Sequence, residues 1–175
     1  MGTSMSPDDP IARLARQIDA AKKADYCVVD ADCVAALRRR GACDLHSMCA
    51  QFVASVNSRL TEASLDLSPS GYSEENFRES GVNLFRIGAE GREIQIAFEA
   101  TQQLFSTEKF LTPYVMEGEV RAYNQTMLQH FAIRSLALFF CVEPDNVTWR
   151  FSDWRTKRAG SVSPDLFVEL MGRLF

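Results

Sequence analysis

Residues 111–124, LTPYVMEGEVRAYN, decide the expected fold because their side chains alternate between two faces with a period of two. One face would be mainly apolar and consists of Tyr114, Met116, Gly118, Val120 and Ala122. The other carries Val115, Glu117, Glu119, Arg121 and Tyr123. This pattern predicts a long strand with one face against a core and the other face polar.

Helical periodicity dominates the first sixty residues of the chain. We predict helices at 11–23, 30–41 and 44–60, with Gly41 as the stop of the second and Asp44 as the cap of the third. The third helix has the most regular apolar stripe, formed by Leu45, Cys49, Phe52, Val56 and Leu60. It would be roughly 25 Å long, at about 1.5 Å per residue, and could cover the apolar face of the strand.

Strand signals and turn residues alternate through the rest of the chain. We expect strands at 82–87, 93–100, 111–124, 139–142 and 147–151, the first two and the last two joined as hairpins. For 125–137, helical spacing after Asn124 and an extended reading both stay open. Ser163 and Pro164 should begin a closing helix. The expected class is therefore α+β, with an antiparallel sheet of about five strands and helices packed on one face.

Length and composition are those of a globular protein. The chain has 175 residues, 46% of them hydrophobic and 24% charged, and we expect one domain over 10–175 after a flexible lead-in at 1–9. Within it, 10–66 should be mainly helical and 82–151 mainly sheet, with the closing helix at 163–175. No apolar run is long enough for a membrane span, and the polar beginning does not resemble a secretory signal. Five cysteines, an odd number, favour free thiols in the cytoplasm.

The charge is unevenly distributed along the chain. The total is −4, but residues 62–119 contain eleven acidic and four basic side chains. An acidic middle segment that carries the sheet would repel phosphates, so nucleic acid is an unlikely partner.

Cys43, His46 and Cys49 have a spacing that superficially resembles a metal cluster. On one helix, however, positions i, i+3 and i+6 spread over about 240°, so the three side chains cannot meet at one ion. We favour a structural role for them and predict no metal and no cofactor. A Cys141–His130 pair stays possible as a nucleophile and base, but core packing explains Cys141 better.

Glu117, Glu119, Arg121 and Tyr123 are our first candidate binding residues because they share the polar face of the strand. Same-face neighbours on a strand lie about 6.6 Å apart, a separation similar to that of the carboxylates of some glycosidases. A solvated or partner-facing surface is the simpler interpretation, and Glu93 and Glu99 could extend it.

A second candidate lies in residues 149–160, WRFSDWRTKRAG, where two tryptophans accompany four basic residues. Trp154 and Arg155 could contact an acidic peptide or a nucleic acid, or could form an ordinary exposed turn. The helices at 30–41 and 44–60 could also imitate a helix-turn-helix. The second helix, however, has only one basic residue, Arg59, which is too few for binding in the major groove of DNA.

These observations favour a cytoplasmic binding or protein-interaction module that uses an open sheet face, with a protein partner or a second copy as a homodimer. The alternative is a small-molecule-binding protein or an enzyme with a pocket between sheet and helices. No catalytic residue is assigned. The later order of elements, helix–strands–helix–strands–helix with an acidic surface, resembles in topology the small secretion chaperones, without a shared motif.

Overall fold

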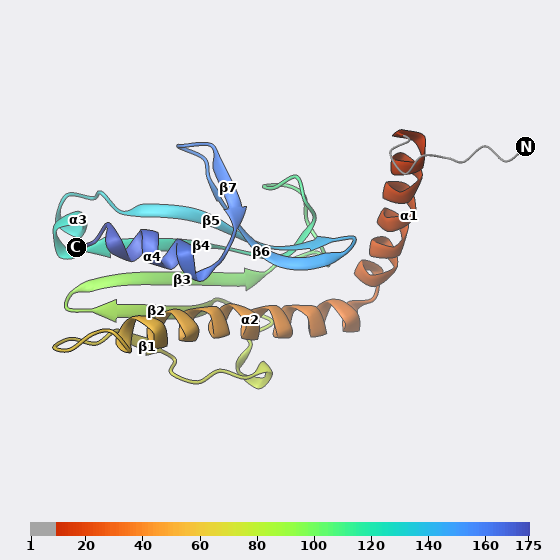
Figure 1. Cartoon of the computed structure of the whole chain (residues 1–175). Coiled ribbons are helices and arrows are strands. Elements are labelled where there is room, and N and C mark those ends of the chain that lie inside the picture. Colours follow the sequence, from red (N-terminus) through yellow and green to blue (C-terminus); the bar gives the residue numbers. More distant parts are fainter. Residues whose placement is uncertain (1–9) are drawn as a thin grey trace, which may run out of the picture.

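The computed structural model describes residues 10–175 and contains a seven-stranded antiparallel sheet. Each strand pairs with the next one along the chain, in the order β1 to β7 (Figure 1). The strands are β1 (Asp66–Ser68), β2 (Asn83–Ala89), β3 (Arg92–Ala100), β4 (Tyr114–Asn124), β5 (Arg134–Glu143), β6 (Asn146–Asp153) and β7 (Arg158–Ser161). The predicted α+β class is confirmed. The two extra strands, β1 and β7, have only three and four residues, too few for an alternating pattern to show in the sequence.

The helices are α1 (Pro10–Val29), α2 (Ala31–Asn57), α3 (Gln125–Gln129) and α4 (Pro164–Gly172), with a single 3₁₀ turn, η1 (Glu74–Asn76). Helices α2 and α4 pack on the same face of the sheet, whereas α1 extends away from it (Figure 1). Helix α4 begins as predicted, with Ser163 at the N-cap position and Pro164 in the first turn. None of these described helices is both long and apolar enough to cross a membrane.

The predicted helix end at Gly41 is wrong, because α2 continues through this position without interruption. Gly41 is needed for close packing instead. A Cβ atom there would collide with the ring of Phe140 on β5. The carbonyl oxygen of Gly41 accepts a hydrogen bond of 2.7 Å from the indole nitrogen of Trp149 on β6. Here a glycine in a helix allows the helix backbone to approach the sheet closely. The two predicted helices are the two halves of α2.

Strand β4 does not alternate regularly over its whole length, because a β-bulge interrupts its pairing with β5. Tyr114 lies opposite Cys141 and Met116 lies opposite Phe140, so Val115 is the extra residue. The bulge turns Val115 into the helix-covered core and Tyr114 to the opposite face. Our assignment of these two side chains to the other faces was therefore wrong, while Val120 and Ala122 face the core as expected.

Residues 125–137, for which two interpretations were open, are divided between a short helix and a strand. Helix α3 is capped by the side chain of Asn124, which accepts a hydrogen bond from the backbone N–H of Met127. From Arg134 onward the chain is extended, because it pairs with β4 on one side and β6 on the other. Long-range pairing thus overrides the helical spacing of its apolar residues.

The hydrophobic core lies between the sheet and the two covering helices. Aromatic rings form its centre, with ring centroids 5.3 Å apart for Phe85–Phe98 and for Phe98–Trp149, and 5.0 Å apart for Trp149–Phe140. All four rings are at most 2% exposed. The opposite face of the sheet, which we call the open face, is not covered by any described helix.

Candidate binding surface

The first four candidate residues lie together on the open face, in the middle of the sheet. Glu117, Glu119, Arg121 and Tyr123 alternate along β4 with the side chains that face the core. Strands β3 and β5 flank β4 on its two sides, so the four residues have neighbours on both. Sequence alternation is enough to bring these residues to one surface, but it does not reveal what surrounds them.

Each of the two glutamates is engaged by a cation. The Nζ atom of Lys109 lies 2.9 Å from Glu117 Oε1 and donates a hydrogen bond to it. Arg121 forms an ion pair with Glu119, and the hydroxyl of Ser135 on β5 donates a hydrogen bond of 2.8 Å to the same carboxylate. Both carboxylates are therefore acceptors in ion pairs and hydrogen bonds with neighbouring side chains.

Tyr123 extends the polar surface to β3. Its hydroxyl donates a hydrogen bond of 2.7 Å to Glu93, which lies directly opposite in the strand register. Burial, followed by this hydrogen bond, raises the pKa of Tyr123. Arg86 on β2 lies 3.7 Å from the same carboxylate. The polar face therefore extends through Glu93, as predicted, and the hydrogen bond from Tyr123 connects the two strands.

Glu99 and Glu117 are directly opposite each other on β3 and β4. Two carboxylates in this position repel each other unless a cation lies nearby. Lys109 supplies that charge from the loop between β3 and β4, and its hydrogen bond to Glu117 raises the pKa of its own amine. The acidic pair Glu99 and Glu117 on the open face is therefore only partly neutralised, by Lys109.

Two adjoining cavities border this acidic pair. The larger, of about 650 Å³, lies at the end of β3 beside Arg38, Glu79 and the 101–109 loop. The smaller, of about 380 Å³, lies on the strands and has Ala97, Ala137 and Phe139 among its apolar lining. Both are lined by Glu99, Lys109 and Glu117. Together they form a groove with an apolar floor and an acidic rim, which we call the open-face groove.

A small aromatic cluster at one end of the groove was not predicted. The ring of Phe110 stacks on Phe139, with centroids 4.9 Å apart, and Tyr114 packs on the same ring at 4.8 Å. Cys141 lies buried among them, and burial raises the pKa of its thiol to about 12. His130 lies at the exposed end of α3, where its Nδ1 contacts the carbonyl of Thr126. Burial in this aromatic cluster keeps the Cys141 thiol protonated and favours a packing role for it.

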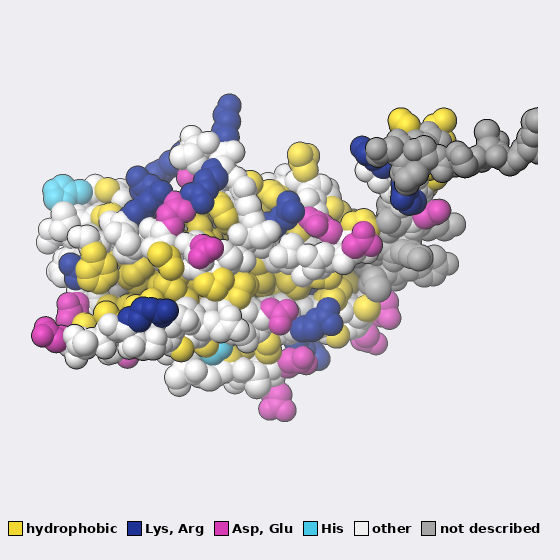
Figure 2. Space-filling model, viewed as in Figure 1, with side chains coloured by type: hydrophobic (Ala, Val, Ile, Leu, Met, Phe, Trp, Pro, Cys, Tyr) yellow, Lys and Arg dark blue, Asp and Glu magenta, His cyan; other side chains and the backbone are white. Residues whose placement is uncertain are grey.

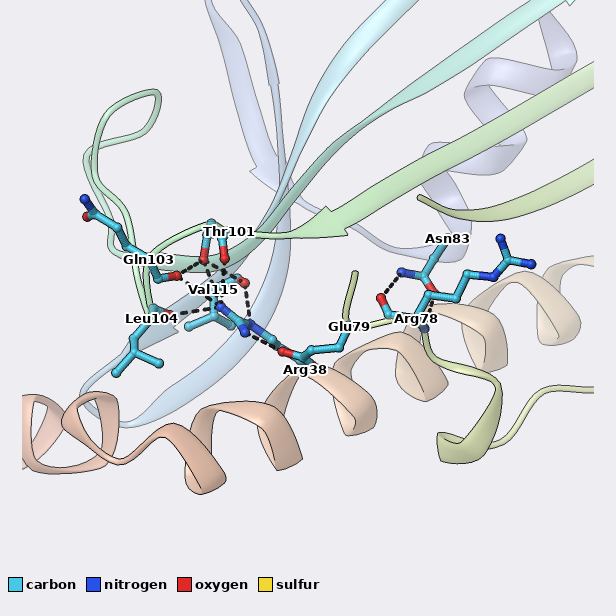
Figure 3. Close-up of polar contacts among 8 residues, drawn as sticks. All are labelled: Arg38, Arg78, Glu79, Asn83, Thr101, Gln103, Leu104 and Val115. Carbon is cyan, nitrogen blue, oxygen red and sulfur yellow. Dashed lines mark hydrogen bonds and ion pairs between the residues drawn. The ribbon is translucent and has the colours of Figure 1, made fainter. Parts of the chain in front are cut away.

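Arg38 on α2 holds the loop that borders the groove, and nothing in the sequence predicted this role (Figure 3). Its side chain is 8% exposed and donates to the carbonyls of Val115, Thr101, Gln103 and Leu104. It also forms an ion pair of 2.5 Å with Glu79. The bulge at Val115 points its carbonyl toward Arg38, and the planar guanidinium can satisfy several acceptors at once.

Asn83 fixes the neighbouring segment in a similar way (Figure 3). Its side-chain amide donates to the carbonyl of Arg78 at 3.0 Å and accepts from the N–H of the same residue at 2.9 Å. Asn83 is only 4% exposed. The connection before β2 is therefore held by two buried polar side chains, and the larger cavity has an anchored wall.

Two of the residues considered for a metal cluster, His46 and Cys49 of α2, have structural surroundings. His46 is 5% exposed, and its Nε2 lies 2.7 Å from the carbonyl oxygen of Pro69, while its ring stacks on Tyr72. Cys49 is buried in the core, and burial raises its pKa to about 12. Within the described part of the chain, no three histidine, cysteine or acidic side chains are arranged to hold a metal ion.

Trp154 and Arg155 are separate from the other candidate residues. They lie in the turn between β6 and β7, where the Arg155 guanidinium is 5.4 Å from the ring centre of Trp154. Trp154 is 74% exposed, and neither residue lines the open-face groove. The helix-turn-helix, against which the single basic residue Arg59 already argued, is excluded because α2 contains no turn.

Comparison with known proteins does not assign the chain to a family. No family model, no curated protein and no solved structure matches the chain.

Proposed function

We propose that the protein is a binding module that captures a segment of a partner protein on the open face of its sheet. The observation that carries this proposal is the open-face groove, which lies on the face without a covering helix and combines an apolar floor with an acidic rim. Apolar contacts supply affinity in such grooves, and a few charged groups supply specificity.

The chemistry of the groove indicates what the partner would carry. The rim includes Glu99, Glu117 and Glu119, and Lys109 is the one cation that lines both cavities. The floor near Phe139 is apolar. A segment with lysine or arginine beside apolar side chains would complement both features.

A second copy of this chain is a less suitable partner for the same surface. In a two-fold symmetric dimer through the open face, each acidic rim would lie against itself or its equivalent. Like charges facing each other across an interface cost free energy. We therefore place a different protein, not a homodimer, on this face, and we keep the cytoplasm as the location because Cys33, Cys43, Cys49 and Cys141 are free thiols.

A small ligand is the second candidate, because the larger cavity of about 650 Å³ is within the range of small-molecule sites. This cavity lies at the end of β3 beside the 101–109 loop. Its lining is mostly polar and includes Arg38 and Glu79.

Affinity capture tests the proposal. Tagged protein expressed in its own cells would be recovered as the wild type, as the double variant Glu99→Ala/Glu117→Ala, which removes the two acids that line both cavities, and as the control Arg59→Ala, which removes an exposed arginine of the segment after α2. We expect the double variant to lose a partner that the wild type and the control both retain. Equal recovery by all three proteins, at equal melting temperature, would refute the proposal.

A further inference from the structure

A third cavity lies away from the open-face groove, between α4 and the β6–β7 hairpin. Its volume is about 240 Å³, and its lining comes from the beginning of β5, the hairpin and α4. The apolar part of the lining consists of core residues, Leu136, Phe151, Leu166 and Leu170. The cavity therefore belongs to the helix-bearing side of the sheet and is independent of the proposed function.

Four arginines from separate elements line this cavity. Arg134 begins β5, Arg155 lies in the hairpin turn, Arg158 begins β7 and Arg173 follows α4. Basic side chains gather in this region above α4 (Figure 2). The lining contains only two acids, Asp153 and Glu169, so its formal charge is +2 in a chain whose total is −4.

Glu169 organises two of the arginines. Its Oε1 accepts hydrogen bonds from Arg158 at 2.7 Å and from Arg173 at 2.6 Å. The bond from Arg158, with further attraction from Arg173 and Arg134, lowers the pKa of Glu169. Glu169 balances part of the charge of Arg158 and Arg173, and Asp153, which accepts a hydrogen bond from the backbone N–H of Arg155, balances part of the charge of Arg155. The excess of +2 is therefore shared by the four arginines, of which Glu169 binds Arg158 and Arg173.

We propose that this cavity binds a small phosphate monoester, with the phosphate between Arg134 and Arg155 and a compact apolar group toward Phe151 and Leu170. A phosphate monoester carries a charge of about −1.5 to −2 at neutral pH, which matches the excess of +2 in the lining. A monocarboxylate would neutralise only half of that excess. Arginine forks bind phosphate oxygens in pairs, and the site offers two such forks beyond those held by Glu169.

The size of the cavity argues for a small molecule and not for a nucleic acid chain. A volume of about 240 Å³ accepts a phosphate with a group such as a phenyl ring, but no run of nucleotides. Trp154, exposed at the tip of the same hairpin, does not line the cavity. The proposed ligand therefore enters between the arginines and ends on the apolar floor.

Isothermal titration calorimetry on the full chain at about 0.15 M salt, with phenyl phosphate as the probe, tests this proposal. We expect Arg134→Ala and Arg155→Ala each to weaken binding by about tenfold or more, the usual loss for a hydrogen bond to a charged group. Lys157→Ala is the matched control, since it removes the same charge from the same hairpin outside the cavity lining. Its effect should stay below about threefold, because an exposed charge is screened.

Glu169→Gln gives a second, opposite test. Loss of its charge frees Arg158 and Arg173 and raises the lining charge to +3, so phenyl phosphate should bind several-fold more tightly. Benzoate should bind more weakly than phenyl phosphate to the wild type. Absence of binding, an equal loss with Lys157→Ala, weaker binding to Glu169→Gln, or benzoate binding as tight as phenyl phosphate would each overturn the proposal. Melting temperatures of all variants, and their capture of an open-face partner, separate this result from the fate of the proposed function.

Discussion

The two faces of the sheet are built from the same strands but differ in what holds their side chains. On the helix-covered face, Phe98, Phe140 and Trp149 form one continuous packed core. On the open face, side chains are held by separate ion pairs, such as Lys109–Glu117 and Arg86–Glu93, and by one small aromatic cluster. Burial of apolar area contributes far more free energy than exposed ion pairs do.

Because of this difference, substitutions of charged side chains on the open face should lower the free energy of unfolding only slightly. Both faces of a β-strand need suitable surroundings for their side chains. In β4 the side chains that face the core stabilise the whole strand. The charged side chains of the same strand are then available for recognition. The following predictions use pairs of matched substitutions on the covered and exposed parts of the molecule.

The largest difference should be found between the two tryptophans. Trp149 is 2% exposed and donates a hydrogen bond to Gly41, whereas Trp154 is 74% exposed. Trp149→Ala should lower the free energy of unfolding by about 4 kcal/mol, because it leaves a cavity in the aromatic core. Trp154→Ala should change it by less than about 0.5 kcal/mol. Urea unfolding followed by circular dichroism measures both values, and similar losses for the two variants would contradict the assigned core.

The next comparison concerns two arginines. Arg38→Ala should cost about 3 kcal/mol, because several buried carbonyl groups lose their donor and Glu79 loses its partner. Arg121→Ala removes only a half-exposed ion pair with Glu119, so its cost should be below about 1 kcal/mol. The same urea titrations compare the two. A mild effect of Arg38→Ala would show that the 101–109 loop is not anchored by this side chain.

The smallest effect should be visible in cysteine reactivity and not in stability. Burial raises the pKa of both Cys49 and Cys141 to about 12, so each thiol is protonated near pH 8 and should react slowly with iodoacetamide. Phe110→Ala uncovers the open-face cluster and should accelerate alkylation of Cys141, while Cys49 under α2 stays slow. Peptide mass spectrometry over time measures both rates. Rapid labelling of Cys141 in the wild type, or equal acceleration of Cys49, would contradict the arrangement.

The elements predicted correctly from the sequence are those with local signals. Ser163 and Pro164 mark the beginning of α4 by their backbone preferences alone. The hairpin between β2 and β3 depends on a two-residue turn in which Glu90 and Gly91 both have positive φ, and the glycine signalled it. The apolar stripe from Leu45 to Val56 likewise forms the C-terminal half of α2, whereas Leu60, which we also assigned to it, lies beyond the end of the helix and is 40% exposed.

The elements predicted wrongly depend on contacts between distant segments. Gly41 has the local appearance of a helix stop, and only Phe140, about one hundred positions later, shows why a glycine is required. The bulge at Val115 is set by pairing with β5 and by the hydrogen bond from Arg38. The local sequence around Gly41 or Val115 gives no sign of these distant partners.

The candidate sites show the same division. Alternation along β4 placed Glu117, Glu119, Arg121 and Tyr123 on one surface. The groove beside them could not be predicted, because it needs the Lys109 loop and the floor at Phe139. The sequence also drew attention to Arg155, but its convergence with Arg134 and Arg173 depends on the packing of α4 against the sheet.

Site-specific photo-cross-linking tests the role of the open face most directly. Benzoylphenylalanine would be incorporated at Ala97, which lines the groove on β3, or at Ala54, which is exposed on α2. After irradiation in its own cells, we expect the protein labelled at Ala97 to form a covalent adduct with a partner, and the protein labelled at Ala54 to form none. An adduct from Ala54 with none from Ala97 would contradict the claim that the open face is the binding surface.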